Sequence, residues 1–271
     1  MTVKSAHRPI GVFDSGIGGL TVVKALRKIL PYEEIVYFGD TARVPYGSKS
    51  PETITQFALQ DAKFLLNRNV KMVIVACHSA SSVALDELKR HFNLPIIGVI
   101  EPGAKAAVKA TRNKRIGVIG TQATILSGAY ERAIRRLCQD VEVIAKPTPL
   151  FVALVEEGWY DNKIALEVAK LYLSPLIKEQ IDTLLLGCTH YPLLKRAIQK
   201  VFPNKIRIVD AGLETAYEAK EQLENLGLKN RHRKRPAIRF YLSDLTPNFS
   251  EIGRRFLGTS LEDVMRASLP E

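Results

Sequence analysis

Cysteine is scarce in this sequence, with only three residues among 271, at positions 77, 138 and 188. A small, odd number of cysteines in a chain of this length argues against a disulfide-stabilised scaffold, so we expect free thiols. The opening MTVKSAHRP leads into a short apolar segment that ends at Phe13, and this pattern does not resemble an export signal. No run of about eighteen apolar residues, the length that a membrane span requires, occurs. We therefore expect a cytoplasmic protein without a membrane partner.

Aromatic residues are also few, at 7%, whereas positive charge is in excess and gives a net charge of +11. The densest basic run extends from Arg231 to Arg235, between Gly227 and Pro236, and contains no aromatic residue. Sites for single-stranded nucleic acid interleave basic and aromatic side chains, so we interpret this run as a solvated loop. We do not expect nucleic acid as a partner, although the positive field would attract a small dianionic substrate.

Short apolar segments alternate with segments of helical character along the whole chain. The first series of apolar segments is PIGVFDSG, EEIVYFGD and MVIVAC, and the second is RIGVIG, VEVIA, TLLLGC and IRIVDAG. This alternation is typical of βαβ units around a parallel sheet that is buried on both faces. The sequence therefore predicts an α/β protein with two parallel-sheet halves.

The two halves resemble each other, because MVIVACHS in the first corresponds to TLLLGCTH in the second. This similarity predicts two pseudo-symmetric α/β domains. The turn-forming segment from Gly98 to Pro102 marks the boundary between them. The later segment RFYLSDLTPNF predicts one more strand and a helix, which we assign to the first domain. The predicted domains are residues 1–99 with 210–271, and residues 100–209.

Polar groups follow several of the predicted strands, where open α/β sheets bind their ligands. These groups are Asp14-Ser15-Gly16, Asp40, Cys77-His78-Ser79, Gly120-Thr121 and Cys188-Thr189-His190. A single cysteine at a strand end is usually a small buried hydrophobe. Two cysteines in equivalent places of two halves point instead to chemistry. Because each is predicted to precede a helix, we expect the helix dipole to lower the pKa of both thiols.

A thiolate and a thiol on opposite sides of a carbon acid can remove a proton from one face and deliver one to the other. A racemase needs this two-sided arrangement. Asp14 near Cys77 and His190 near Cys188 are candidates to assist the thiols. The simpler alternatives are that Asp14 caps a helix and that His190 forms a loop hydrogen bond. We assign no role to Cys138, which lies in a basic helical stretch.

Two other kinds of site compete with this interpretation. The pairs Cys77-His78 and Cys188-x-His190 lack the ligand spacing of structural zinc sites, so we expect no metal. The glycines of Gly16-x-Gly18-Gly19 form part of a dinucleotide-binding fingerprint, but Thr21 occupies the third glycine position. A nucleotide-binding oxidoreductase therefore remains an alternative, as does a non-enzymatic binding protein. A tight strand-to-helix turn would explain the same glycines.

Six motifs extend over most of the chain: FDSGIGGLTV (13–22), FGDTARVPYGSKS (38–50), VACHSAS (75–81), IGVIGTQAT (116–124), LLLGCTHYPLL (184–194) and SDLTPNF (243–249). In these motifs and their order the chain resembles the bacterial glutamate racemases. The resemblance implies two α/β domains with the active site in the cleft between them. It also implies no pyridoxal phosphate, no metal and no other cofactor. The implied activity interconverts L- and D-glutamate and supplies D-glutamate for peptidoglycan, with racemisation of aspartate or another acidic amino acid as the alternative.

The resemblance places the family's catalytic cysteines on Cys77 and Cys188, and its assisting acid and histidine on Asp14 and His190. Hydroxyls and loop N–H groups suit the two carboxylates of glutamate without adding a competing base. The implied substrate-binding positions are Asp14, Ser15, Pro45, Tyr46, Gly47, His78, Ser79, Thr121, Thr124, Glu156 and Thr189. We further expect a homodimer.

One position departs from the family, which usually has Cys-Asn-Thr where this chain has Cys77-His78-Ser79. Ser79 keeps a hydroxyl. His78 replaces an amide that contacts substrate in the family, and an imidazole can donate a hydrogen bond but can also ionise. We therefore expect His78 to lower the pKa of Cys77 or to alter substrate fit, and so to shift the pH dependence of activity.

Overall fold

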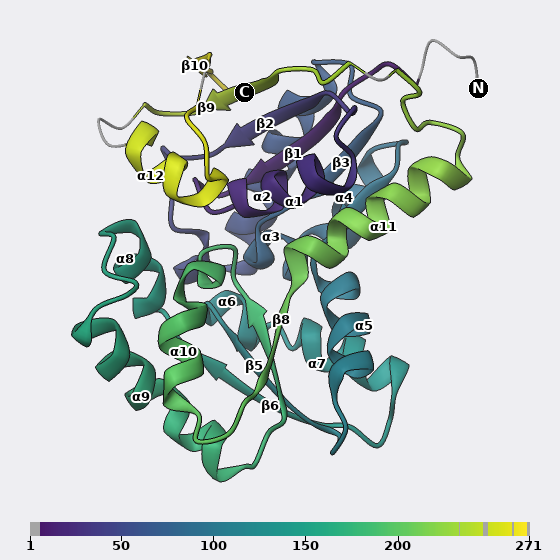
Figure 1. Cartoon of the computed structure of the whole chain (residues 1–271). Helices are drawn as coiled ribbons and strands as arrows, with labels where there is room; N and C mark the ends of the chain where they lie inside the picture. The colour runs from purple at the N-terminus through teal and green to yellow at the C-terminus, as the bar shows by residue number, and fades with distance from the viewer. Residues whose placement is uncertain (1–5, 233, 246–248, 262, 270–271) are drawn as a thin grey trace.

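The computed structural model describes residues 6–232, 234–245, 249–261 and 263–269. Its strands form two separate sheets, and every pair of neighbouring strands is parallel. The sheets occupy two halves of the molecule, with helices packed around each (Figure 1). The predicted α/β class with two parallel sheets is confirmed.

The first sheet has six strands in the order β10-β9-β2-β1-β3-β4. Its central strands are buried on both faces, because their sequences are continuous apolar runs rather than alternating ones. The strands are β1 (Ile10–Asp14), β2 (Ile35–Gly39), β3 (Met72–Val75), β4 (Ile96–Gly98), β9 (Ile238–Leu242) and β10 (Val264–Arg266). The helices of this half are α1 (Leu20–Ile29), α2 (Pro51–Leu66), α3 (His78–Val83), α4 (Leu85–His91) and α12 (Phe249–Leu257), with the 3-10 helix η2 (Tyr46–Ser48).

The second sheet has four strands in the order β6-β5-β7-β8. The strands are β5 (Arg115–Gly120), β6 (Glu142–Pro147), β7 (Thr183–Gly187) and β8 (Arg207–Asp210). The remaining helices are α5 (Ile100–Ala110), α6 (Gln122–Leu126), α7 (Ala129–Leu137), α8 (Leu150–Glu156), α9 (Lys163–Lys178), α10 (Lys195–Val201) and α11 (Ala211–Asn225), with the 3-10 helix η3 (Tyr191–Leu194). Helix α11 packs against both α1 and α5, so it joins the two halves (Figure 1).

The chain passes between the halves after β4 and again after β8, and it then returns to the first sheet. Strand β9 pairs in parallel with β2, with Ile238 opposite Ile35, and α12 follows. The predicted strand and helix near the C-terminus thus both occur, although residues 246–248 of the SDLTPNF motif lie outside the described residues. The division into residues 1–99 with 210–271 and residues 100–209 stays a proposal.

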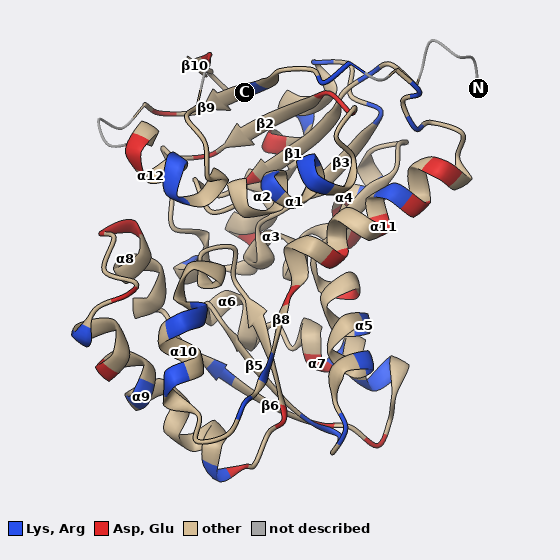
Figure 2. Cartoon of the chain, in the orientation of Figure 1, with Lys and Arg blue, Asp and Glu red and all other residues tan. Residues whose placement is uncertain are grey.

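Basic and acidic residues alternate along the ribbon of both halves in Figure 2, rather than being separated by sign. Arg233, within the basic run, lies outside the described residues. Among the helices that the structure describes, none combines the length and the apolar character needed to cross a membrane.

Candidate active site

Strand ends from the two halves meet through hydrogen bonds. The hydroxyl of Thr189, which follows β7, donates to Oδ1 of Asp14 at 3.4 Å. The hydroxyls of Ser79, at the start of α3, and Thr121, after β5, are 2.9 Å apart. Parallel strands present their carboxyl ends at one edge of each sheet, and here the two edges face one another. The structure therefore brings together candidate residues that are far apart in the sequence.

Cys77 lies at the N-cap of α3 and is only 5% exposed. Its Sγ is 3.5 Å from Oγ of Ser15. Burial, and next the negative charge of Asp14, raise the pKa of Cys77 to about 12, despite stabilising contacts from Ser15 and the N–H of Ala80. The expectation that a helix N-terminus would lower this pKa is wrong for Cys77, because removal of the thiolate from water outweighs what the short helix α3 supplies.

Asp14 ends β1 and is completely buried. Its Oδ2 accepts a hydrogen bond from the backbone N–H of Gly16 at 3.0 Å, so it organises the glycine turn that follows. It is not the cap of α1, whose N-cap residue is Gly19. Burial raises the pKa of Asp14, whereas the positive charge of His190 and the hydrogen bonds to the carboxylate oppose that rise. Asp14 thus lies between the two sides of the site.

Cys188 follows β7 and is 6% exposed, with Sγ 3.8 Å from Nδ1 of His190. The other ring nitrogen, Nε2, is 3.0 Å from Oε1 of Glu156. Burial lowers the pKa of His190, but hydrogen bonds and negative charge from Cys188 and Glu156 outweigh it and raise the pKa to about 10. An imidazolium therefore faces the sulfur of Cys188 at neutral pH.

The expectation of a helix dipole behind Cys188 is wrong. Thr189 and His190 come next, followed by the 3-10 helix η3, and α10 begins only at Lys195. The histidine supplies the positive charge that the sequence interpretation attributed to a helix. The two thiols thus differ in their surroundings: Cys77 has a buried acid nearby, and Cys188 has a buried cation.

The glycines of the first turn permit close packing between the halves. A methyl group on Gly18 would lie 2.3 Å from Oγ1 of Thr189 and 2.5 Å from Nδ1 of His190. One on Gly19 would lie 2.5 Å from Cβ of Asp14. These contacts explain the glycine pattern, because any side chain would displace catalytic candidates. The space beside Gly18 is occupied by His190, which favours the tight turn over a dinucleotide site.

The remaining substrate-binding candidates lie around the same edge. Gly47 approaches Thr121 so closely that a methyl group on Gly47 would be 2.6 Å from Cβ of Thr121. Thr121 is the N-cap of α6, and its Oγ1 is 3.0 Å from Oγ1 of Thr124. Pro45 is exposed. Tyr46 is 1% exposed and its hydroxyl contacts Asp61, so only its backbone is available to a substrate.

His78 does not behave as the sequence suggested. Its ring is 4% exposed, packs edge-on against Tyr130 of α7 at 6.0 Å between centroids, and has no hydrogen-bond partner on either nitrogen. Burial lowers the pKa of His78 to about 3. The expectation that His78 could ionise near working pH, and thereby lower the pKa of Cys77, is wrong for this structure. Its effect on substrate fit stays a prediction.

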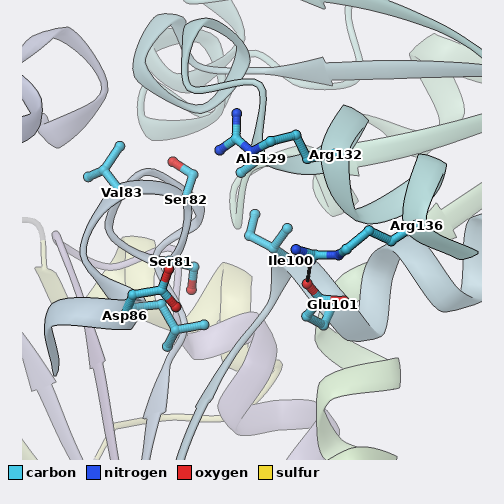
Figure 3. A pocket seen from close by; sticks show the side chains of 10 residues that line it. Ser81, Ser82, Val83, Asp86, Ile100, Glu101, Ala129, Arg132 and Arg136 are labelled. Carbon is cyan, nitrogen blue, oxygen red and sulfur yellow. Dashed lines mark hydrogen bonds and ion pairs between the residues drawn. The ribbon is translucent and has the colours of Figure 1, made fainter. Parts of the chain in front are cut away.

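Other features lie apart from these residues. Cys77, Cys138 and Cys188 are all free thiols, and Cys138 is distant in sequence from the candidate segments. Within the described ranges, no group of three or more His, Cys, Asp or Glu side chains could hold a metal ion. A cavity of about 140 Å³ lies between α3 and α7 (Figure 3). Ser82, Asp86 and Arg132 line it and Arg136 pairs with Glu101 at its edge, but none of the candidate residues lines it.

Two residues that the sequence interpretation missed support the site. The hydroxyl of Tyr37, in β2, donates to the carbonyl of Gly16 at 2.7 Å and holds the glycine turn. A tyrosine in an otherwise apolar buried strand signals such a partner, because a buried hydroxyl needs a hydrogen bond. Phe256, in α12, packs edge-on against His190 at 5.2 Å between centroids. No signal in the sequence could have connected α12 with this histidine.

Two α/β halves that present two buried thiols, one beside an acid and one beside a cation, define the class of amino-acid racemases, which are isomerases. A family model described as Asp/Glu/hydantoin racemase matches residues 19–219. The chain belongs to the Asp/Glu/hydantoin racemase family.

Relatives of known structure and sequence agree with this assignment. The chain is 49% identical to the glutamate racemase of Geobacter metallireducens over 262 residues, which cover 97% of each protein. The structure matches the glutamate racemase of Francisella tularensis in complex with D-glutamate with a TM-score of 0.92 and 42% identity, covering 97% of this chain and 98% of the other. It matches the glutamate racemase of Thermus thermophilus with a TM-score of 0.88 and 46% identity, covering 97% and 98%.

Proposed function

We propose that this chain is a glutamate racemase that interconverts L- and D-glutamate by moving protons to and from the α-carbon through Cys77 and Cys188. Its relatives at 42–49% identity over nearly the whole chain carry that name, and one was solved with D-glutamate. The product, D-glutamate, would supply peptidoglycan synthesis. Both proton-transfer groups belong to the chain itself, so the proposed reaction uses neither pyridoxal phosphate nor a metal.

The observation that carries the proposal is the difference between the surroundings of the two thiols. The pKa of Cys77 is raised to about 12, so this residue rests as a thiol. Cys188 faces His190, whose pKa of about 10 keeps the imidazole protonated, so we propose that Cys188 acts as the base. The proposed proton transfer needs one acid and one base, and we assign these roles to Cys77 and Cys188.

In the proposed reaction, the Cys188 thiolate removes the α-proton of one enantiomer, and the Cys77 thiol donates its proton to the opposite face. The enzyme is then left with a Cys77 thiolate and a Cys188 thiol, which are the groups needed for the reverse direction. His190 stabilises the thiolate form of Cys188, and Asp14 opposes ionisation of Cys77. We assign no proton transfer to Asp14 or His190 themselves.

The substrate carboxylates need donors that do not compete for the α-proton. We propose that hydroxyl and backbone groups of the candidate set hold them, because such groups donate hydrogen bonds without acting as bases at neutral pH. The donors in the set are Ser15, Tyr46, Gly47, Ser79, Thr121, Thr124 and Thr189. Pro45 has no N–H to donate and belongs to the set through contact alone, and Glu156 acts through His190. For His78 we propose only an effect on how well the substrate fits the site.

Replacement of each thiol tests the roles of the cysteines. Cys77→Ser and Cys188→Ser should each abolish racemisation, because a hydroxyl is a far weaker acid than a thiol and is not ionised to act as a base at working pH. Circular dichroism, started from either enantiomer, measures the racemisation. Cys138→Ser is the matched control and should keep the parent activity. Racemisation that survives either site replacement at more than a small percentage of the parent rate would contradict the two-thiol mechanism.

Aspartate is the substrate alternative, since the family includes enzymes for both amino acids. Comparison of kcat/KM for glutamate and aspartate decides between them, and we expect glutamate to be preferred. We further propose that the protein acts as a homodimer in the cytoplasm. Light scattering of the purified protein tests the dimer.

A further inference from the structure

A second cluster of buried ionisable side chains lies behind the loop that carries Pro45 and Gly47. Asp40 and Asp61 are completely buried, Tyr46 is 1% exposed, and the side chain of Arg43 is 21% exposed. The proposed proton transfers use none of these groups. Burial of two carboxyl groups costs free energy unless they are paired and hydrogen-bonded. The contacts that compensate for this cost indicate what the cluster does.

Arg43 is held by three kinds of contact. Its Nε donates to Oδ2 of Asp40 at 2.6 Å, and its Nη2 donates to Oδ1 of Asp61 at 3.0 Å. Its guanidinium lies 4.0 Å above the ring of Phe57, and its Nη1 donates to Gln60. Phe57, Gln60 and Asp61 share one face of α2, because residues three and four positions apart are neighbours on a helix. Helix α2 therefore supports the loop from behind.

The hydroxyl of Tyr46 is placed between the two acids. It is 2.9 Å from Oδ2 of Asp61 and also hydrogen-bonds to Oδ2 of Asp40. Asp40 additionally accepts a hydrogen bond from the hydroxyl of Ser243 at 2.8 Å. A tyrosine has one proton to donate, so it cannot donate to two carboxylates at once. One of the two acids must therefore carry a proton and donate to the tyrosine oxygen.

Charge identifies which acid is protonated. Arg43 supplies a single positive charge for two acids, and Asp40 has the additional donor Ser243. Burial, and next the charge of Asp40, raise the pKa of Asp61 well above its usual range, although Arg43 opposes this. The cluster is then an Asp40–Arg43 ion pair with a neutral Asp61 and a neutral Tyr46.

The cluster fixes the part of the loop that faces the other half. Tyr46 begins η2, and Gly47, the next residue, lies against Thr121, whose hydroxyl also contacts Ser79. Because the Tyr46 hydroxyl is held by Asp40 and Asp61 while Gly47 lies against Thr121, the backbone at Tyr46 and Gly47 is held by contacts from both residues. A preorganised backbone binds a ligand more tightly, since less disorder is lost on binding.

We propose that Asp61 is a positioning residue for substrate binding, which acts with Asp40 and Arg43 through the Tyr46 hydroxyl to hold the Tyr46–Gly47 backbone against Thr121. The inference rests on the proposed function, because it assigns that backbone to a carboxylate of glutamate. Asp61 acts as a neutral hydrogen-bonding group, not as a charge. An amide of the same shape should therefore replace it, whereas an apolar side chain of similar size should not.

The experiment compares Asp61→Asn with Asp61→Leu in the full chain. Asp61→Asn should keep KM for glutamate within about twofold of the parent, because its amide can donate to Tyr46 and accept from Arg43. Asp61→Leu should raise KM about tenfold or more with a smaller change in kcat, as expected when an interaction common to ground and transition states is lost. Asp182→Leu is the control for general destabilisation, because it removes a partly buried acid in the second half that accepts hydrogen bonds from the Thr111 hydroxyl and the Arg112 N–H.

A second measurement does not depend on activity. Hydrogen–deuterium exchange of peptides that cover residues 41–50 should become faster in Asp61→Leu but not in Asp61→Asn or Asp182→Leu. Equal KM and equal exchange in the leucine and asparagine variants would overturn the inference, as would a tenfold rise in KM for Asp61→Asn. Failure of the parent to racemise glutamate would instead overturn the proposed function. The exchange measurement would still test whether Asp61 holds the backbone of residues 41–50 in place.

Discussion

Glu156 should set the upper pH limit of activity through His190. Its Oε1 is 3.0 Å from Nε2 of His190, and the pKa of His190 is about 10, above the ordinary value of 6.5. Replacement by Glu156→Gln removes one negative charge while keeping a hydrogen-bonding group. At an effective dielectric constant of about 20, two unit charges about 4 Å apart interact by about 4 kcal/mol, but the Glu156 side chain is 36% exposed. After discounting for solvent, we expect the pKa of His190 to fall by about 1.

The direction of the expected pH shift follows from the need for a protonated His190. His190 favours the Cys188 thiolate only while it carries its proton, so kcat/KM should fall as pH rises through the pKa of His190. In Glu156→Gln this fall should begin about one pH unit lower. The two enantiomers have equal free energies, so kcat/KM is the same from either one, and a single profile between pH 7 and 10.5 suffices. Glu157→Gln, the exposed neighbour, is the control. An unmoved alkaline limb in Glu156→Gln, or one shifted upward, would refute the reasoning.

Two further predictions concern Gly18 and His78. Gly18→Ala should lower kcat/KM by about a hundredfold, because its methyl group would displace His190, whereas Gly212→Ala, whose methyl group would meet nothing closer than 3.3 Å, should not. A folded and fully active Gly18→Ala enzyme would count against the packing argument. His78→Asn should leave the pH profile of kcat/KM unchanged, because the pKa of His78 is lowered to about 3 and the ring stays neutral. The unfolded chain takes up a proton below about pH 6.5 that the folded state does not, so the parent should lose up to about 2 kcal/mol of stability between pH 7 and 5 from this residue. Urea unfolding at the two pH values should show that His78→Asn removes this loss, and an equal loss in both proteins would contradict it.

The sequence predicted the strands well, because their apolar runs are continuous and end at polar groups. MVIVAC and TLLLGC became β3 and β7, with Cys77 two residues beyond the end of β3 and Cys188 directly after β7. The division into two sheets followed from the repeated alternation. These features depend on local pattern, which a single sequence records.

The electrostatic surroundings of the thiols could not be predicted in the same way. The rise in the pKa of Cys77 depends on burial and on Asp14, which is 63 positions away in the sequence. The charge on His190 depends on Glu156, which α8 brings from 34 positions earlier. Tyr46 illustrates the same limit: its motif indicated a substrate contact, but its side chain turns toward Asp61 in α2. Such contacts arise only when the elements pack.

The most direct test of the central claim follows the α-proton in D₂O. Purified protein is mixed with L-glutamate, without pyridoxal phosphate or added metal, and proton NMR and optical rotation are recorded together. The two-thiol account predicts that rotation is lost and that, early in the reaction, the D-glutamate formed carries deuterium while the remaining L-glutamate keeps its proton, since the donor thiol has exchanged with solvent. D-Glutamate that retains the original proton, or no loss of rotation at all, would contradict the account.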